Sequence, residues 1–110
     1  MGMEDCVFCK IIKGEIPCEK VIETSHYVAF KDIHPKAPVH ILIVPKVHRE
    51  KPEELTADEL YDMFRGSEEI AQIQGVKETG YRLLFNVGEH AGQVVDHVHM
   101  HLLGGKQLPN

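Results

Sequence analysis

The stretch His97-Val98-His99-Met100-His101-Leu102-Leu103 decides how this chain folds. Imidazoles alternate with apolar side chains, and successive side chains of a β-strand point to opposite faces. The pattern therefore predicts a strand over 97–103, with three imidazoles on one face and the core on the other. Residues two apart advance by about 6.6 Å, so the outer Cα atoms would lie about 13 Å apart. That separation disfavours one ion held by all three histidines and favours separate roles for them.

Other segments predict the elements that surround this strand. A short helix is predicted over 6–13, and a long helix from the capping box of Thr56 and Glu59 to about Gln74. The long helix should bury one stripe, formed by Leu60, Met63, Phe64, Ser67 and Ala71. A hairpin and two further strands are predicted over 19–24, 27–33, 40–44 and 81–87. We expect an α+β fold, a five-stranded antiparallel sheet with one long and one short helix, in a single domain over 1–110.

Composition argues against several classes of partner. The formal net charge is −5, and the chain lacks the clustered Lys and Arg that nucleic-acid binding requires. No apolar run approaches the roughly 20 residues that span a membrane, and residues 1–5 lack the basic start of a signal peptide. Two of the three cysteines form Cys6-x2-Cys9, a spacing typical of free or metal-binding thiols in a reducing compartment. The sequence therefore predicts a cytoplasmic protein with no nucleic-acid or membrane partner.

Short motifs accompany the histidine stretch along nearly the whole chain. They lie at 30–33 (FKDI), 35–40 (PKAPVH), 43–46 (IVPK), 86–88 (NVG) and 91–93 (AGQ). With these motifs the chain resembles the histidine-triad (HIT) family. Its motif order and short length are similar to the Hint-like branch, whose members are dimeric hydrolases of nucleoside phosphoramidates and aminoacyl adenylates. The resemblance implies a HIT-like fold, a homodimer, and a purine nucleotide or nucleotide conjugate as the ligand.

The resemblance assigns the chemistry to three histidines. His99 would attack the α-phosphorus and form a nucleotidyl-histidine, while His101 and His40 would place protons and stabilise charge at the phosphate. A neutral imidazole suits this role because its unperturbed pKa lies near 6.5. Water would then release AMP or GMP, with no cofactor required for catalysis. From spacing alone, a structural histidine at a strand start is the simpler interpretation of His40.

The resemblance also implies a nucleotide pocket. Apolar side chains would enclose the purine, Asp32 would accept hydrogen bonds from the ribose hydroxyls, and backbone N–H groups of the loop 88–93 would hold phosphate. The side-chain amides of Asn86 and Gln93 would hydrogen-bond the nucleotide. From the residues alone, core, turn and hairpin roles explain these positions as well. The implied nucleotide-binding set is Val7, Phe8, Ile11, Phe30, Asp32, Ile33, Leu42, Asn86, Gly92, Gln93, Val94, His99 and His101.

A further group has the composition of a metal site. Cys6 and Cys9 supply half of a tetrahedral zinc site, but the distant His48 and His97 do not form the short second pair of a zinc finger. Free thiols are the alternative from spacing alone. Several bacterial relatives look alike in binding structural zinc through a cysteine pair, a histidine after the Pro-Lys segment and the first triad histidine. The resemblance therefore implies structural Zn²⁺ on Cys6, Cys9, His48 and His97.

Two departures from the Hint-like pattern keep alternatives open. Val94 stands where many relatives have a polar residue near the leaving group, and the tail after Gly105 lacks their aromatic, proline-containing ending. One alternative is a dinucleoside polyphosphate hydrolase or nucleotidyl transferase that uses the same His99. Another is a catalytically weak nucleotide-binding or scaffold protein. A third is catalytic zinc held by His97 and His99 and activating water.

Overall fold

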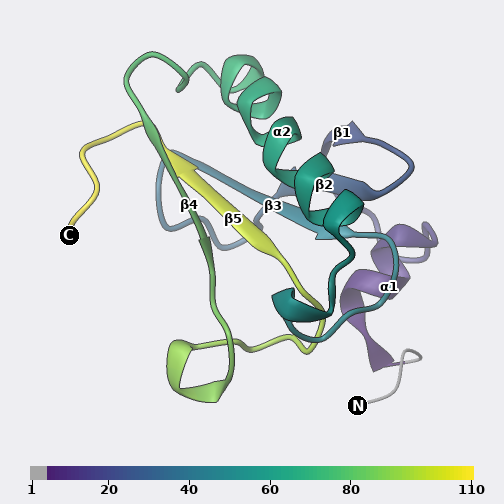
Figure 1. Cartoon of the computed structure of the whole chain (residues 1–110). Helices are drawn as coiled ribbons and strands as arrows, with labels where there is room; N and C mark the ends of the chain where they lie inside the picture. Colours follow the sequence, from purple (N-terminus) through teal and green to yellow (C-terminus); the bar gives the residue numbers. More distant parts are fainter. Residues whose placement is uncertain (1–4) are drawn as a thin grey trace.

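The computed structural model describes residues 5–110 (Figure 1). Residues 1–4, which carry most of the sequence argument against a signal peptide, lie outside the described residues. Within residues 5–110, no helix has both the length and the apolarity needed to cross a membrane. The elements follow one another as α1 (Val7–Ile12), β1 (Lys20–Glu23), β2 (Tyr27–Lys31), β3 (Val39–Pro45), η2 (Pro52–Glu54), α2 (Ala57–Ile73), β4 (Tyr81–Phe85), η3 (Glu89–Ala91) and β5 (Met100–Gly104).

The five strands form one antiparallel sheet in the order β1-β2-β3-β5-β4. The predicted α+β fold and the predicted hairpin of β1 and β2 are confirmed. β5 comes last along the chain but lies inside the sheet, between β3 and β4 (Figure 1). The strand that carries His101 is therefore paired along both of its edges.

The two helices cover opposite faces of the sheet. Alternate residues of β2 and β3 divide between two cores, because successive strand side chains point to opposite faces. Ala29 and Ile43 pack in the core formed with α2, whereas Phe30 and Leu42 pack in the core formed with α1. His40 shares the parity of Leu42, so it lies on the α1 face. The α1 face therefore receives the polar chemistry, and the α2 face is apolar core.

The helix α2 begins at the predicted capping box, in which Thr56 and Glu59 each bond the other's backbone. Its predicted buried stripe was wrong at two positions, because Leu60 is 42% exposed and Phe64 is 59% exposed. The helix instead buries a row of side chains that begins one residue earlier, at Glu59. Members of this row recur every third or fourth residue, as one helical face requires. That buried row consists of Glu59, Met63, Ser67, Ile70 and Ala71.

The predicted strand over 97–103 was wrong at its start, because β5 begins only at Met100. The N–H of Val98 donates to the carbonyl of Arg49 at 2.7 Å, so this segment bonds a loop rather than β3 or β4. Pairing with both neighbours begins where Met100 meets Ile43 and Phe85. His97 and His99 therefore precede the strand, and their side chains are free to take different directions.

Candidate active site and metal centre

A cavity of about 400 Å³ opens on the α1 face of the sheet. Every residue of the predicted nucleotide-binding set lines it except Gln93. Its apolar part comes from α1, β2 and β3, and its polar part includes His99, His101, Asp32 and Asn86. Sequence reasoning missed further lining residues; all but Lys31 lie outside the helices and strands, where no periodic pattern reports which way a side chain points. They are Ile16, Pro17, Cys18, Lys31, His34, Lys36 and Val95.

His99 is 7% exposed and is held in one tautomer. Its Nδ1 lies 2.8 Å from the carbonyl oxygen of His97, which can only accept, so Nδ1 carries the proton. Nε2 then keeps its lone pair. Burial lowers the pKa of His99, although the hydrogen bond to the His97 carbonyl and the charge of Asp32 oppose that shift. The imidazole is therefore neutral near pH 7, and Nε2 is the nitrogen that can act as a nucleophile.

His40 and His101 form a hydrogen-bonded pair beside His99. The backbone N–H of Lys36 donates to His40 Nδ1 at 3.1 Å, so the proton of neutral His40 sits on Nε2. That N–H lies 2.9 Å from His101 Nδ1 and 3.4 Å from a carboxylate oxygen of Asp32. Donation to His101 Nδ1 leaves the His101 proton on Nε2. His101 Nε2 is buried without a hydrogen-bond partner among residues 5–110, so a donor stands ready beside the His99 ring.

Burial keeps this pair neutral. It is the largest cause that lowers the pKa of His101 to about 4, and the charges of His99 and His40 add to it. Burial likewise lowers the pKa of His40, although the nearby carboxylate of Asp32 acts in the opposite direction. Neither imidazole therefore carries a charge near pH 7.

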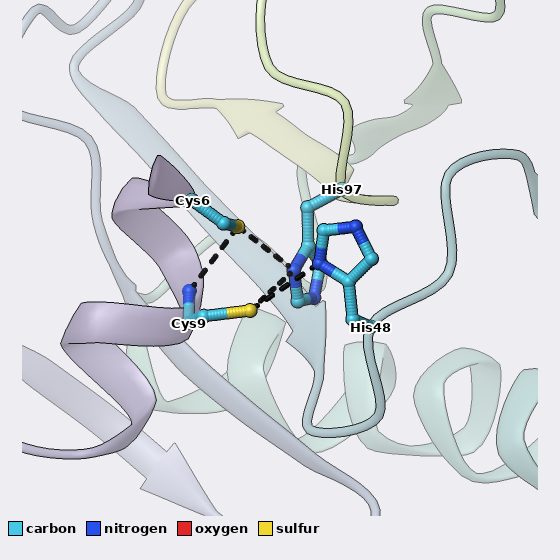
Figure 2. A group of neighbouring side chains, drawn as sticks. All are labelled: Cys6, Cys9, His48 and His97. Atoms are coloured by element: carbon cyan, nitrogen blue, oxygen red, sulfur yellow. Dashed lines mark hydrogen bonds between the residues drawn. The ribbon is translucent and has the colours of Figure 1, made fainter. Parts of the chain in front are cut away.

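Four side chains meet at the N-terminus of α1 as a possible metal centre (Figure 2). His97 Nδ1 lies 3.2 Å from Cys6 Sγ and 3.6 Å from Cys9 Sγ, and His48 Nδ1 lies 3.3 Å from Cys9 Sγ. His97 Nε2 donates to the Pro45 carbonyl at 2.8 Å, which fixes the proton there and leaves the Nδ1 lone pair facing the sulfurs. All four ligand atoms lie within 4.8 Å of one another.

These donors fit a tetrahedral metal ion. Bonds of about 2.3 Å to sulfur and about 2.0–2.1 Å to nitrogen place donor atoms roughly 3.5 Å apart on a tetrahedral ion, close to the separations seen here. The backbone N–H of Cys9 donates to Cys6 Sγ at 3.3 Å, which favours a thiolate. Without a cation, burial and the neighbouring Cys6 raise the pKa of Cys9 to about 11. A bound divalent cation would offset that cost, so the group can bind a metal ion.

His97 and His99 do not converge on a common ion. Among the described residues, the side chains close enough to share an ion are Cys6/Cys9/His48/His97 and Asp32/His40/His101. In the second group, a metal on His40 Nε2 would require a proton on Nδ1, where the Lys36 N–H already donates. That group is therefore a hydrogen-bonded chain, and the predicted alternative of a His97–His99 zinc has no geometric support.

A family model, the HIT domain, matches residues 13–108 of this chain. The chain belongs to the HIT family. It is 43% identical over 108 residues to the purine nucleoside phosphoramidase of Escherichia coli K12, covering 96% of this chain and 91% of that protein. It is 44% identical over 107 residues to the adenosine 5'-monophosphoramidase of Candida albicans, covering 92% of this chain and 70% of that protein.

Solved HIT structures share the fold. A HIT family hydrolase from Clostridium thermocellum superposes with a TM-score of 0.93 at 45% identity, covering 97% of this chain and 96% of that one. The predicted HIT-like α+β fold is therefore confirmed, as is the prediction of a histidine-triad hydrolase. The cysteine pair and its two histidines agree with the CxxC pattern that the resemblance implied.

Proposed function

We propose that this HIT protein hydrolyses purine nucleoside phosphoramidates or aminoacyl adenylates at the α-phosphate, through a nucleotidyl-His99 intermediate. One observation carries the proposal: His99 presents an unprotonated Nε2 in the wall of a nucleotide-sized cavity, with its proton fixed on Nδ1 by the His97 carbonyl. The phosphoramidases among its relatives support a phosphorus–nitrogen bond as the target. The released product is AMP or GMP.

In the first step, Nε2 of His99 attacks the α-phosphorus and forms the P–N bond to the enzyme. The bond to the leaving amine breaks, and the amine nitrogen takes its electron pair and a proton from solvent. His101 Nε2–H donates a hydrogen bond to the reacting phosphate and keeps its proton, while His40 Nε2–H, facing His101 Nδ1 at 2.9 Å, holds that ring in place. In the second step, water attacks phosphorus and loses a proton to solvent, and the bond to His99 breaks with its electron pair returning to Nε2.

Binding would come from both parts of the cavity. Phe8, Ile11 and Phe30 offer apolar surface for a purine without base-specific hydrogen bonds. Asp32 Oδ1 accepts the N–H of His34 at 2.8 Å, and a carboxylate retains further lone pairs for ribose hydroxyls. Because the base site is apolar, we expect adenine and guanine nucleotides to bind comparably.

Intact-mass analysis tests the intermediate. Wild type, His99→Ala and His26→Ala proteins are mixed with adenosine phosphoramidate, quenched rapidly and weighed, while AMP release is followed in parallel. We expect an AMP adduct and turnover in wild type and in His26→Ala, because His26 pairs with Asp62 and does not line the cavity. Both signals should vanish in His99→Ala. Turnover that survives in His99→Ala would sink the covalent mechanism.

The leaving-group side of the cavity keeps a second substrate class open. Val94 is 85% exposed and offers no polar contact, while the ammonium-bearing Lys36 also lines the cavity. A cation near the phosphate suits an anionic leaving group, as in a dinucleoside polyphosphate hydrolase. Comparison of kcat/KM for adenosine phosphoramidate and diadenosine polyphosphate separates the two activities. Product analysis with inorganic phosphate as the acceptor in place of water tests nucleotidyl transfer. Tight AMP binding without turnover would indicate a binding or scaffold protein.

We propose Zn²⁺ as the ion of the Cys6/Cys9/His48/His97 group. Two thiolates and two imidazoles form a complete tetrahedral set with no open position, as in structural zinc sites. The ion would join α1 to the segment before β5 and would supply folding free energy rather than chemistry. We expect nucleotide hydrolysis itself to require no cofactor.

We also propose that the chain is one domain over 1–110, located in the cytoplasm and assembled as a homodimer through the outer face of α2. Leu60, Tyr61 and Phe64 leave an apolar surface of that helix exposed, by 42%, 65% and 59%. A second copy of α2 would cover it. Sedimentation should give a dimer for wild type and a monomer for Phe64→Glu; a wild-type monomer would contradict the proposal.

A further inference from the structure

The side chain of Gln93 has no hydrogen-bonding capacity left for a ligand. Its Oε1 accepts the N–H of Gly88 at 2.8 Å and the Nζ of Lys51 at 3.0 Å. Its Nε2 donates to the carbonyls of Glu50 at 2.8 Å and Val95 at 3.1 Å. A carboxamide has two acceptor sites and two donor hydrogens, so these four bonds use all of them. Gln93 is also the one member of the implied nucleotide-binding set that does not line the cavity.

Three of the four bonds join two segments that are distant in sequence, and the fourth goes to Val95. One is the loop 88–92, which is already closed by hydrogen bonds from the N–H groups of Ala91, Gly92 and Gln93 back into the loop. Asn86 adds a bond from its side-chain amide to the Ala91 carbonyl. The other segment is Glu50–Lys51, some forty residues earlier in the chain. The loop is therefore a preformed unit, and Gln93 attaches it to the rest of the site.

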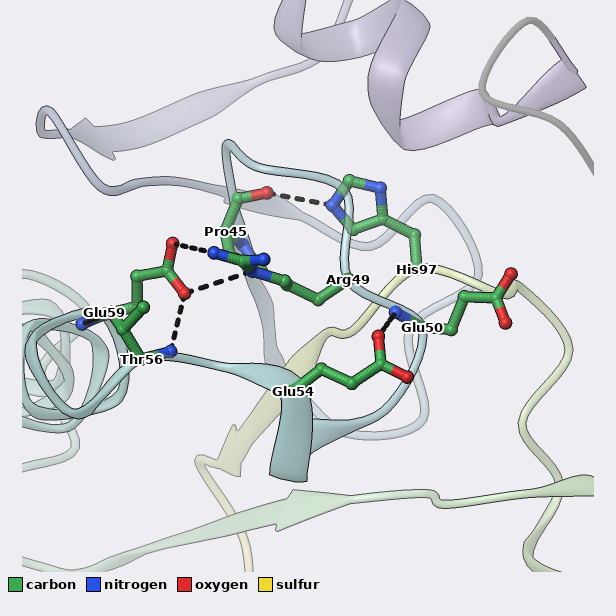
Figure 3. A network of polar contacts seen from close by, with 7 residues as sticks. All are labelled: Pro45, Arg49, Glu50, Glu54, Thr56, Glu59 and His97. Atoms are coloured by element: carbon green, nitrogen blue, oxygen red, sulfur yellow. Dashed lines mark hydrogen bonds and ion pairs between the residues drawn. The ribbon is translucent and has the colours of Figure 1, made fainter.

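The segment 48–51 contacts several separate parts of the active-site region. His48 faces Cys9, and the carbonyl of Arg49 accepts the N–H of Val98, between His97 and His99. The Arg49 guanidinium pairs with the buried Glu59 of α2 (Figure 3). Glu50 and Lys51 bond Gln93. We call residues 48–51 the connector, because it joins the metal centre, the histidine segment, α2 and the loop.

We propose that Gln93 is a positioning residue, which fixes the loop 88–92 on the connector and makes no contact with the nucleotide. Gly92 and Val94 flank Gln93 and line the cavity near His99 and His101. The placement of this wall relative to the attacking nitrogen therefore depends on the Gln93 amide. This role of Gln93 depends on the proposed function in one respect only, namely which reaction takes place beside that wall of the cavity.

Gln93→Met tests the inference, because it keeps the length of the side chain and removes all four hydrogen bonds. In nucleotide-free protein, hydrogen exchange at the Gly88 N–H should accelerate at least tenfold, while exchange in β3 stays unchanged. For folded enzyme, kcat with adenosine phosphoramidate should fall about tenfold or more, because reacting groups lose their alignment. Gln72→Met, the same change at an exposed glutamine of α2, should match wild type in both measurements.

Lys51→Met provides an independent variant, because Lys51 does not line the cavity and reaches the loop only through Gln93 Oε1. It should produce part of the same acceleration of exchange, and its effect should disappear in the Gln93→Met background. Additive effects would overturn the inference. The inference would also be overturned if Gln93→Met lost affinity for AMP while hydrogen exchange in the loop stayed slow, because Gln93 would then bind the nucleotide directly. Accelerated exchange with unchanged kcat would show a merely structural role.

The loop measurements are separable from the proposed activity. Hydrogen exchange and AMP affinity require no turnover, so they remain informative if wild type forms no adduct with adenosine phosphoramidate. In that case an unchanged Gly88 exchange rate in Gln93→Met overturns the positioning role. An accelerated rate accompanied by weaker AMP binding in both Gln93→Met and Lys51→Met supports it.

Discussion

His40 Nε2 and His101 Nδ1 lie 2.9 Å apart, although 61 residues separate these histidines in the chain. A single proton fits between the two nitrogens, so the contact is made only while the accepting His101 nitrogen is unprotonated. Both imidazoles have lowered pKa values, chiefly because burial disfavours their charged forms. The pair therefore links the protonation state of the active site to the stability of the fold.

We expect the free energy of unfolding to fall as the pH drops from 6.5 toward 4. The pKa of His101 is about 4 in the folded state and near 6.5 when unfolded, so the unfolded chain binds more protons in this window. At pH 5 the shifted pKa of His101 should lower the free energy of unfolding by roughly 1–2 kcal/mol relative to pH 7. Urea unfolding at pH 7, 6 and 5 measures the loss, and His101→Gln should reduce it in part, because burial also lowers the pKa values of His40 and His99. An equally steep loss in His101→Gln would assign the effect elsewhere.

Metal removal should lower thermal stability without directly stopping catalysis. Chelation with EDTA should lower Tm by several degrees, because binding energy of the ion to the native state is folding energy. Cys9→Ser should behave similarly, whereas Cys18→Ser, outside the metal group, should keep the chelation response of wild type. Scanning calorimetry and AMP release on the same samples check this. Immediate loss of turnover in chelated but still folded protein would indicate a catalytic ion.

Arg49→Met should destabilise the protein by about 2 kcal/mol, because Glu59 is only 6% exposed and would lose its charged partner. Burial alone would raise the pKa of Glu59, but hydrogen bonds from Thr56 and Arg49 together lower it. Lys20→Met removes the solvent-exposed Lys20–Glu23 pair and should have no comparable effect. Urea midpoints compare the two variants, and equal midpoints would mean that the Arg49–Glu59 pair contributes nothing.

Gly66→Ala should destabilise the protein, although alanine normally improves a helix interior by about 1 kcal/mol. A Cβ at position 66 would overlap the hydroxyl and ring of Tyr27, which is 1% exposed and cannot easily move. We expect a loss of about 1–3 kcal/mol, as for other overpacked cores. Tyr27→Phe removes the hydroxyl, so the double variant Gly66→Ala/Tyr27→Phe should recover part of the lost stability. A stabilised Gly66→Ala protein would refute the close packing.

Local patterns in the sequence predicted much of the fold. The capping box at Thr56 and Glu59 marks the start of α2, because both of its hydrogen bonds lie within one helical turn. Alternation predicted β5 but placed its start three residues early. The missing information is the bond from Val98 to Arg49, a partner 49 residues away that no local pattern reports. Leu60 and Phe64 were misplaced for a similar reason, since helical spacing alone does not say which row faces the sheet.

The sequence likewise predicted some residues of the candidate site correctly and misplaced another. Cavity-lining residues such as Phe30 and Asp32 could be placed because they belong to a motif that the family shares. Gln93 belongs to such a motif too, but its amide bonds Glu50, Lys51, Gly88 and Val95 rather than facing the cavity. A motif therefore identifies residues that a site needs, while their three-dimensional partners decide which of them can touch a ligand.

The place of β5 between β3 and β4 makes assembly of the active site inseparable from completion of the sheet. β4 pairs only with β5 among the described strands, so it has no place in the sheet until the last strand arrives. That strand brings His101, with His99 directly before it, against residues from the opposite end of the chain. In an incompletely folded chain these histidines are consequently not assembled beside their neighbours, and a nascent protein completes its active site only together with its final, cooperative structure.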